Sequence, residues 1–274
     1  MSDSRPIGII DSGLGGLTVV KEIQRLMPGE RVIYFGDTAR GPYGGHSEEV
    51  IRNNATEVAE YLMKMDVKML ISSCNTVSSV ALEHIERRMK DIPVIGVVLP
   101  GARAAVLRTA ERKVGVIGTE MTIHSNAYTR AIQNMDSSLK VYGKSCPLFV
   151  PIVEEKMLDH DITRLVTQYY LYEMIDLGVD CIILGCSHYS LLMETIQGTV
   201  GTRIQLIDSA LWTAKEVQDI LTALKGFHPE QTGGFESSRF LVTDIAIHTG
   251  DQASMFIGKP ITNQLQKISP ERES

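Results

Sequence analysis

Hydrophobic residues in this chain gather in short runs that alternate with longer stretches of helical periodicity. The short runs predict β-strands, and the periodic stretches between them predict amphipathic helices. We expect strands near residues 6–10, 31–35, 67–73, 93–98, 114–117, 140–143, 180–185 and 203–207, and helices at 17–27, 47–65, 77–90, 123–135 and 162–177. This alternation is typical of α/β proteins whose parallel sheets carry helices on both faces.

The C-terminal part of the chain departs from this alternation. A helix is expected at about 210–224, followed by a loop that contains Pro229 and Gly233-Gly234, and then a strand or helix pair near 238–258. Proline and glycine interrupt regular structure, which places the loop between these elements. We expect this tail to return to the first domain, which would make that domain discontinuous.

Two of the strand-like runs end in a cysteine at the same register. The first extends from Val67 to Cys74 and the second from Val179 to Cys186, and a polar turn follows each cysteine. Residues 7–12 resemble residues 114–119, and these two segments are separated by almost the same number of residues as the two cysteine runs. Residues 93–98 likewise resemble residues 203–208. Three segments that repeat in one order indicate two homologous halves, and the alternative is chance similarity among valine-rich strands.

These observations predict an α/β protein with two similar doubly wound parallel-sheet domains, related by pseudo-twofold symmetry, and an active site in the cleft between them. The first domain would comprise residues 1–97 and 209–274, and the second residues 98–208. Ligands of parallel sheets bind just beyond the carboxyl ends of the strands. The two cysteine turns are therefore expected at two equivalent binding edges.

The composition narrows the class of protein. The chain has 274 residues, 43% of them hydrophobic, so it can bury a sizeable core. A formal net charge of −6 offers no general electrostatic attraction to nucleic acid or to an anionic membrane. The first residues form no apolar leader and no later segment supplies an uninterrupted membrane span, so we expect a cytoplasmic protein whose four cysteines remain thiols.

Two turns offer candidate binding groups. The turn at residues 11–18 is rich in glycine, but it matches only part of a dinucleotide fingerprint, and its backbone N–H groups also suit a small carboxylate. Asp11 argues against a closely bound phosphate, because two anions repel one another without a metal between them. The loop at 36–49 combines Asp37 with Pro42-Tyr43-Gly44, and we favour a substrate-binding loop over a surface turn there.

Five ordered motifs together resemble the glutamate racemase family of the aspartate/glutamate racemase superfamily. They are the glycine-rich segment 11–17, the loop with Pro42, Tyr43, Gly44 and Ser47, the tripeptide Cys74-Asn75-Thr76, residues 151–155, and residues 185–189. The resemblance runs from residue 7 to about residue 212, and more loosely to the end of the chain. It implies a 1,1-proton transfer that interconverts L- and D-glutamate without a cofactor and supplies D-glutamate for peptidoglycan.

The resemblance further implies that two thiols act on opposite faces of the substrate. The catalytic groups would be Cys74 with Asp11 and Asp37 for D-glutamate, and Cys186 with Glu154 and His188 for L-glutamate. An ordinary cysteine has a pKa of ~8.5, which is near enough to neutral for its surroundings to tune it in either direction.

Substrate binding is assigned by the resemblance to hydroxyl, amide and backbone groups. The polar groups of the amino acid would be held by Ser12, Asn75, Thr76 and Ser187, and its carboxylates by Tyr43, Gly44, Thr119 and Thr122, with Pro42 in the same loop. The sequence departs from the family at His46, where arginine or lysine is usual, and at Ser187, where threonine is usual. These departures leave both thiols in place and bear on substrate affinity.

The sequence leaves several alternatives open. One is an aspartate or broader amino-acid racemase, because one methylene in a pocket discriminates by only ~1–3 kcal/mol. Another is a noncatalytic amino-acid-binding or regulatory protein. Cys186-Ser187-His188 also resembles half a zinc site, but no tight CxxC pair or second nearby histidine completes it, so no metal is expected. Cys146 and Cys181 are assigned to structure, and a homodimer is left open.

Overall fold

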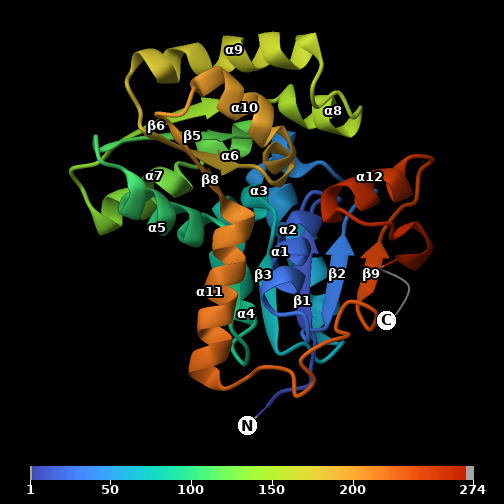
Figure 1. Cartoon of the computed structure of the whole chain (residues 1–274). Coiled ribbons are helices and arrows are strands. Elements are labelled where there is room, and N and C mark those ends of the chain that lie inside the picture. The colour runs from blue at the N-terminus through green and yellow to red at the C-terminus, as the bar shows by residue number, and fades with distance from the viewer. Residues whose placement is uncertain (1, 270–274) are drawn as a thin grey trace.

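The structure is a computed structural model that describes residues 2–269. Its strands form two sheets in which every pair runs parallel, and the sheets lie in separate lobes (Figure 1). The first sheet has the order β10 (Leu265–Lys267), β9 (Arg239–Val242), β2 (Val32–Gly36), β1 (Ile7–Asp11), β3 (Met69–Ser72), β4 (Val94–Gly96). The second has the order β6 (Lys140–Ser145), β5 (Lys113–Gly118), β7 (Cys181–Gly185), β8 (Gln205–Asp208).

The two sheets repeat one strand order. The order β2-β1-β3-β4 in the first sheet corresponds to β6-β5-β7-β8 in the second, so β1 and β5 hold equivalent places. Ile7 lies opposite Met69 in the first sheet, and Val114 lies opposite Cys181 in the second. This repeat confirms the prediction of two similar parallel-sheet halves. It also makes β3 and β7, the strands that precede Cys74 and Cys186, equivalent.

Helices pack on both faces of the sheets. In the first lobe α1 (Leu17–Leu26) packs against α11 (Ser209–Leu224) and α12 (Thr249–Ile257), and α2 (Glu48–Met63) packs against α3 (Asn75–Val80) and α4 (Leu82–Arg88). In the second lobe α5 (Val98–Arg108) packs against α7 (Ala127–Met135), and α9 (Asp161–Asp176) against α10 (Met193–Val200). The remaining short helices are α6 (Glu120–His124), α8 (Phe149–Glu154), η1 (Tyr43–Gly45), η2 (Ser187–Leu192) and η3 (Thr262–Gln264).

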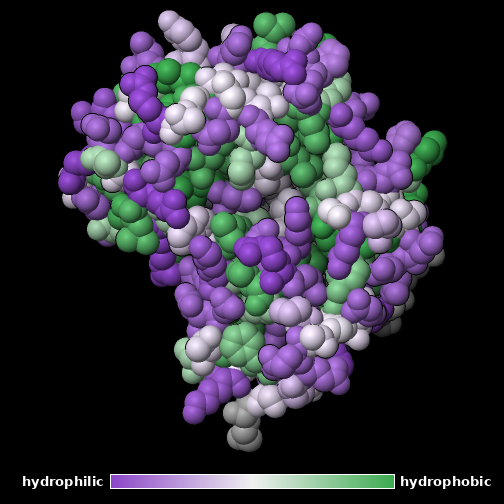
Figure 2. Space-filling view, viewed as in Figure 1, coloured by the Kyte–Doolittle hydropathy of each residue, from purple (hydrophilic) through white to green (hydrophobic). Residues whose placement is uncertain are grey.

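Burial on both faces explains the continuous hydrophobic runs of the strands. Ile7 and Ile9 of β1 pack in one core cluster with α1, whereas Ile10 packs in another with α2. The face of the molecule shown in Figure 2 is largely hydrophilic, with hydrophobic residues interspersed among the hydrophilic ones. Within residues 2–269, no helix combines the length and the apolar character that a membrane crossing requires.

Two predicted helices are each divided in the structure. The helix expected over 77–90 is α3 followed by α4, with a break at Ala81, and the helix expected over 123–135 is α6 followed by α7. The second break is at Asn126, whose φ of 55° lies in the left-handed region that asparagine tolerates better than most residues. The strand expected over 93–98 ends at Gly96, because the buried residue Val98 already begins α5. Helices α5, α8 and α10 have no counterpart among the predicted helices.

The C-terminal tail adds two strands to the first sheet. β9 pairs with β2, with Leu241 opposite Phe35, and β10 pairs with β9. α12 lies between these strands in the sequence and packs against α1. The tail is therefore a strand, a helix and a further strand, rather than the single pair expected near 238–258. The domain boundaries after residues 97 and 208 stay a prediction.

A buried ion pair ties the tail to the first sheet. Lys68 Nζ lies 2.7 Å from Glu30 Oε2, and the two side chains are only 3% and 1% exposed. Lys68 also donates to the carbonyl oxygen of Gly226 at 2.8 Å, and Glu30 Oε1 accepts from the backbone N–H of His228 at 2.7 Å. Because both charges have further hydrogen-bond partners, neither is left uncompensated in the interior.

Replacement of Lys68 by methionine (Lys68→Met) would leave the Glu30 carboxylate buried without its counter-ion. We expect the free energy of unfolding, measured by urea denaturation at neutral pH, to fall by about 3–5 kcal/mol. The double variant Lys68→Met/Glu30→Gln removes both charges and should recover part of this loss. A loss below about 1 kcal/mol in the single variant would mean that the pair contributes no more than an exposed one.

Candidate active site

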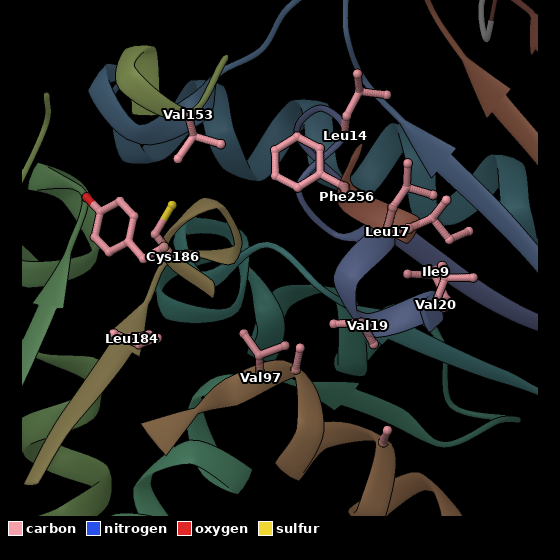
Figure 3. Packing of buried hydrophobic residues seen from close by; sticks show 14 of the residues in the cluster. Ile9, Leu14, Leu17, Val19, Val20, Val97, Val153, Leu184, Cys186 and Phe256 are labelled. Carbon is pink, nitrogen blue, oxygen red and sulfur yellow. The ribbon is translucent and has the colours of Figure 1, made fainter. Parts of the chain in front are cut away.

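Both cysteine turns lie where a strand ends. Cys74 follows β3 and precedes α3, and Cys186 follows β7 and precedes η2. The two side chains are buried, with exposed fractions of 6% and 7%. Burial is the main cause that raises the pKa of Cys74, and a negative charge on Cys186 would raise it further. The sulfur of Cys186 points toward Val153 of α8 (Figure 3).

Glycines allow the backbone of the first half to contact the second half. A Cβ atom on Gly15 would lie 2.3 Å from Ser187 Oγ and 2.8 Å from His188 Nδ1, which is closer than real atoms approach. A Cβ on Gly44 would likewise lie 2.8 Å from Thr119 Cβ. The absence of a side chain at these two positions therefore brings the turns after β1 and β2 against the second half.

The Cys74 side of the site combines a thiol with a buried carboxylate. Ser12 Oγ lies 3.3 Å from the sulfur of Cys74. The Asp11 carboxylate accepts hydrogen bonds from the N–H of Gly13 and from Ser73 Oγ, each at 3.0 Å. Burial and, next, the charge of Asp11 raise the pKa of Cys74 to about 12, although the hydrogen bond with Ser12 opposes them. Cys74 is therefore a protonated thiol at neutral pH.

The Cys186 side has an imidazole instead. His188 Nδ1 lies 3.9 Å from the sulfur of Cys186, and His188 Nε2 lies 3.2 Å from Glu154 Oε1. The ring also packs edge-on against Phe256 of α12, with ring centroids 4.9 Å apart. Burial by itself lowers the pKa of His188, but hydrogen bonds with Cys186 and Glu154 outweigh it and raise the pKa to about 10. The ring is therefore an imidazolium at neutral pH.

Asp37 is engaged by several donors in the loop after β2. Its carboxylate accepts hydrogen bonds from Tyr43 OH, from Arg40 Nε at 2.7 Å and from Thr243 Oγ1 at 2.9 Å. Both of its oxygens therefore have partners, and a guanidinium compensates its charge. This arrangement makes Asp37 a support for Tyr43, and its assistance to Cys74 stays a prediction.

Three threonine hydroxyl groups meet between the two halves. Thr76 Oγ1 of α3 lies 3.0 Å from Thr119 Oγ1 and 3.4 Å from Thr122 Oγ1, and the last two atoms lie 3.0 Å apart. Each hydroxyl group donates one hydrogen bond and accepts others. The cluster can therefore exchange its mutual hydrogen bonds for bonds to a ligand oxygen, which suits a carboxylate.

Asn75 presents a buried amide directly after Cys74. Its Oδ1 accepts a hydrogen bond from Tyr128 OH at 2.6 Å. Its Nδ2 is buried and has no hydrogen-bond partner in the part of the chain that the structure describes. Leaving a buried donor unsatisfied costs about 1–3 kcal/mol, and an oxygen of a bound ligand would remove this cost.

A cavity of about 210 Å³ opens beside Ser12 and His188, and neither Cys74 nor Cys186 is among its lining residues. The predicted site residues in its lining are Ser12, Pro42, Glu154 and His188. Gln252 and Phe256 of α12 line it as well, and Gln252 Nε2 donates to the backbone carbonyl of Glu154 at 3.1 Å. The tail therefore forms one wall of the site. A larger cavity of about 730 Å³ lies between α9 and α10, and its lining contains none of the predicted site residues.

The other two cysteines lie outside this arrangement. Cys181 is the first residue of β7 and Cys146 follows β6, and both side chains are fully buried. Burial raises the pKa of Cys181 to about 12. Across residues 2–269, no group of three or more His, Cys, Asp or Glu side chains is placed to hold a metal ion.

Comparison with known proteins identifies the family. The family model described as Asp/Glu/Hydantoin racemase matches residues 7–217. The chain belongs to this family. It is 49% identical to the glutamate racemase of Chlorobaculum tepidum over 81% of this chain and 82% of that one. It is 42% identical to the glutamate racemase of Geobacter metallireducens over 98% of each chain.

A solved structure of another racemase has the same fold. The crystal structure of glutamate racemase from Francisella tularensis in complex with D-glutamate has a TM-score of 0.91 and 36% sequence identity. The similarity covers 98% of this chain and 99% of that chain. The predicted family and the predicted α/β fold with two parallel-sheet domains are therefore confirmed.

Several residues that shape this racemase site belong to none of the sequence motifs. Gln252 and Phe256 come from the tail, and Tyr128 reaches Asn75 from the other half. No local pattern marks these contacts, because they join segments that are far apart in the sequence. Arg40 differs, since it follows Asp37 by three residues, and a carboxylate and a guanidinium at this spacing are a detectable signal for a local ion pair.

The surroundings of His188 predict an unusual titration. We expect its imidazole to keep its proton at pH 8, and we expect Glu154→Gln to lower the His188 pKa by removing a carboxylate that favours the charged ring. Histidine NMR titration measures both effects, and Glu155→Gln, at the exposed neighbouring position, is the matched control. A wild-type pKa of ~6.5, the value of an unperturbed histidine, would contradict the assigned contacts.

The same shift predicts how stability depends on pH. The folded-state pKa of His188 is raised to about 10, above the unfolded value. The charged ring therefore contributes its full stabilisation below pH ~6.5, and this contribution is lost as the pH rises through about 10. Denaturation of the wild type and of His188→Gln across this range should give a difference in unfolding free energy that shrinks with rising pH.

Proposed function

We propose that this chain is a glutamate racemase, an isomerase that interconverts L- and D-glutamate by moving a proton at the α-carbon. The observation that carries the proposal is the pair of buried thiols, Cys74 and Cys186, at the ends of equivalent strands in the two halves. Inversion at one carbon requires a base on one face and an acid on the other. Glutamate is the proposed substrate because relatives that match nearly the whole chain bear the name glutamate racemase.

The reaction from L- to D-glutamate uses both thiols. The thiolate of Cys186 takes the α-proton, and the electron pair of the broken C–H bond stays on the substrate, delocalised into the α-carboxylate. That pair then forms a new C–H bond with the proton of the Cys74 thiol on the opposite face. The cycle leaves Cys186 as a thiol and Cys74 as a thiolate, from which the reaction of D-glutamate begins.

The surroundings of the two sulfurs suit opposite starting roles. Cys74, whose pKa is about 12, holds a proton that it can donate. The imidazolium of His188 places a positive charge 3.9 Å from the sulfur of Cys186, where a thiolate has to exist during the reaction. Glu154 holds this ring through its other nitrogen.

The polar groups between the halves support a binding mode for glutamate. We assign one carboxylate of the substrate to the hydroxyl cluster of Thr76, Thr119 and Thr122, with Asn75 Nδ2 as a further donor. The other substrate contacts are assigned to Ser12, Pro42, Tyr43, Gly44 and Ser187. Support for these assignments comes from Gly15 and Gly44, whose backbones lie against the second half.

The proposed reaction also has a cellular role. D-Glutamate is a component of bacterial peptidoglycan, and we propose that this cytoplasmic enzyme supplies it. The proposal also includes a homodimer and two domains. Residues 1–97 and 209–274 would form the first domain, and residues 98–208 the second. Light scattering of the purified protein would measure the oligomeric state.

Loss of either thiol should stop the reaction in both directions. We expect Cys74→Ala and Cys186→Ala each to lower kcat by at least ~10²-fold with L- and with D-glutamate, because each direction needs one acid and one base. Circular dichroism of the substrate follows the turnover. Cys181→Ala, which removes a buried thiol outside the site, is the matched control and should keep the wild-type kcat. Near-normal turnover by either site variant would reject the two-thiol assignment.

A direct test of the reaction is incubation with L-glutamate in D₂O without added cofactor. We expect loss of optical rotation together with loss of the α-proton NMR signal, because each inversion delivers a solvent-derived deuteron. Aspartate is measured in parallel. Turnover of aspartate would favour an aspartate or broader racemase, and exchange on neither substrate would favour a noncatalytic amino-acid-binding protein.

A further inference from the structure

Tyr128 links the backbone near both cysteines through a single side chain. It lies in α7 and is 2% exposed. Its hydroxyl donates to Asn75 Oδ1 at 2.6 Å, and Asn75 directly follows Cys74. Its ring packs against Gly185, where a Cβ atom would lie 3.3 Å from Tyr128 Cε2, and Gly185 directly precedes Cys186. Tyr128 therefore contacts a neighbour of each proposed catalytic thiol.

The direction of the hydrogen bond decides how the Asn75 amide is turned. Burial raises the pKa of Tyr128, so the phenol keeps its proton and acts as a donor. A donor requires the oxygen end of the amide, which directs the nitrogen end away from the phenol. That nitrogen, Asn75 Nδ2, is a buried donor that has no partner among the described residues.

A ligand carboxylate is the acceptor that this donor fits. Thr76, the next residue, belongs to the hydroxyl cluster with Thr119 and Thr122, so the Asn75 amide directly precedes, along the chain, one of three hydroxyl groups that meet between the halves. An Asn75 amide turned by a half rotation would present its oxygen to the carboxylate instead. Two acceptors facing each other form no hydrogen bond, so this orientation would bind the substrate poorly.

We propose that Tyr128 is a positioning residue whose hydroxyl holds the Asn75 amide with Nδ2 directed at a carboxylate of bound glutamate. The inference rests on the proposed function, because it takes glutamate as the ligand. Tyr128 acts through Asn75 and is assigned no contact with the substrate.

The variant Tyr128→Phe removes the hydroxyl and keeps the ring that packs on Gly185. The amide is then free to adopt both orientations, so KM for L- and for D-glutamate should rise about tenfold, the value expected for one net hydrogen bond. The thiols are untouched, so kcat should change much less than KM. A purely structural hydroxyl would instead lower the melting temperature and leave KM at 25 °C unchanged.

A double-mutant cycle tests whether the effect passes through Asn75. Asn75→Ala alone should raise KM, and Tyr128→Phe added to it should cause no further rise, because no amide is left to orient. Tyr170→Phe is the matched control. Tyr170 is a buried tyrosine of the same half whose hydroxyl accepts from the backbone N–H of Leu148 at 3.2 Å, and its loss should leave KM unchanged.

The outcomes separate this inference from the proposed function. Wild-type turnover of glutamate with an unchanged KM in Tyr128→Phe would overturn only the positioning role. An equal rise in KM with and without the Asn75 side chain would also overturn it. Absence of glutamate turnover by the wild type would overturn the proposed function and, with it, this inference.

Discussion

The close approach of the Gly15 backbone to the Ser187–His188 turn is the constraint on which the site depends. A side chain at Gly15 would overlap the Ser187 hydroxyl and the His188 ring, so the absence of a side chain at this position allows the halves to meet at this distance. The end of β1 and the turn that follows it, which contain Asp11 and Ser12, are thereby held against the turn after β7. Parallel pairing in each sheet places these turns at the carboxyl ends of strands, and the glycine contact brings the two ends together.

The two halves share a strand order but give their cysteines opposite electrostatic surroundings. Cys74 lies near a buried carboxylate that disfavours its ionisation, whereas Cys186 lies 3.9 Å from an imidazole that a second carboxylate holds. The repeat places the two sulfurs at equivalent positions. The neighbouring side chains determine whether each sulfur is a thiol or a thiolate. This difference suits a reaction in which one thiol must give a proton while the other takes one.

The interior contains many polar groups, and most of those described above have partners. Lys68 and Glu30 compensate each other just before strands β3 and β2 of the first sheet, and Asp37 is compensated by Arg40 in the loop that carries Tyr43. Asn75 Nδ2 is different, because it is buried in the residue that follows Cys74 and has no acceptor among residues 2–269. An unsatisfied donor reduces stability in the free protein and gains a partner when a ligand binds. The cost of burying it is therefore consistent with a binding role.

The sequence alone determined the α/β class, the duplication and the positions of both thiols. A short hydrophobic run indicates a buried parallel strand. Cys74 and Cys186 each come at the end of such a run, so the sequence itself places both thiols at the carboxyl ends of strands. The sequence pattern did not predict the breaks at Ala81 and Asn126, because each lies inside a continuous periodic stretch and only the local backbone conformation interrupts the helix. It also missed α5, whose first residues extend the hydrophobic run of β4.

Only the tertiary structure decided which residues surround the thiols. Tyr128 contacts Asn75, and Gln252 lies beside Glu154. Both contacts join segments that are far apart in the chain, so no local sequence pattern predicts them. The state of each proton was likewise decided by burial and by neighbours such as Asp11, which act through space. A sequence specifies local conformation through short-range rules, whereas the electrostatics of a site depend on which distant groups the fold brings within a few ångströms.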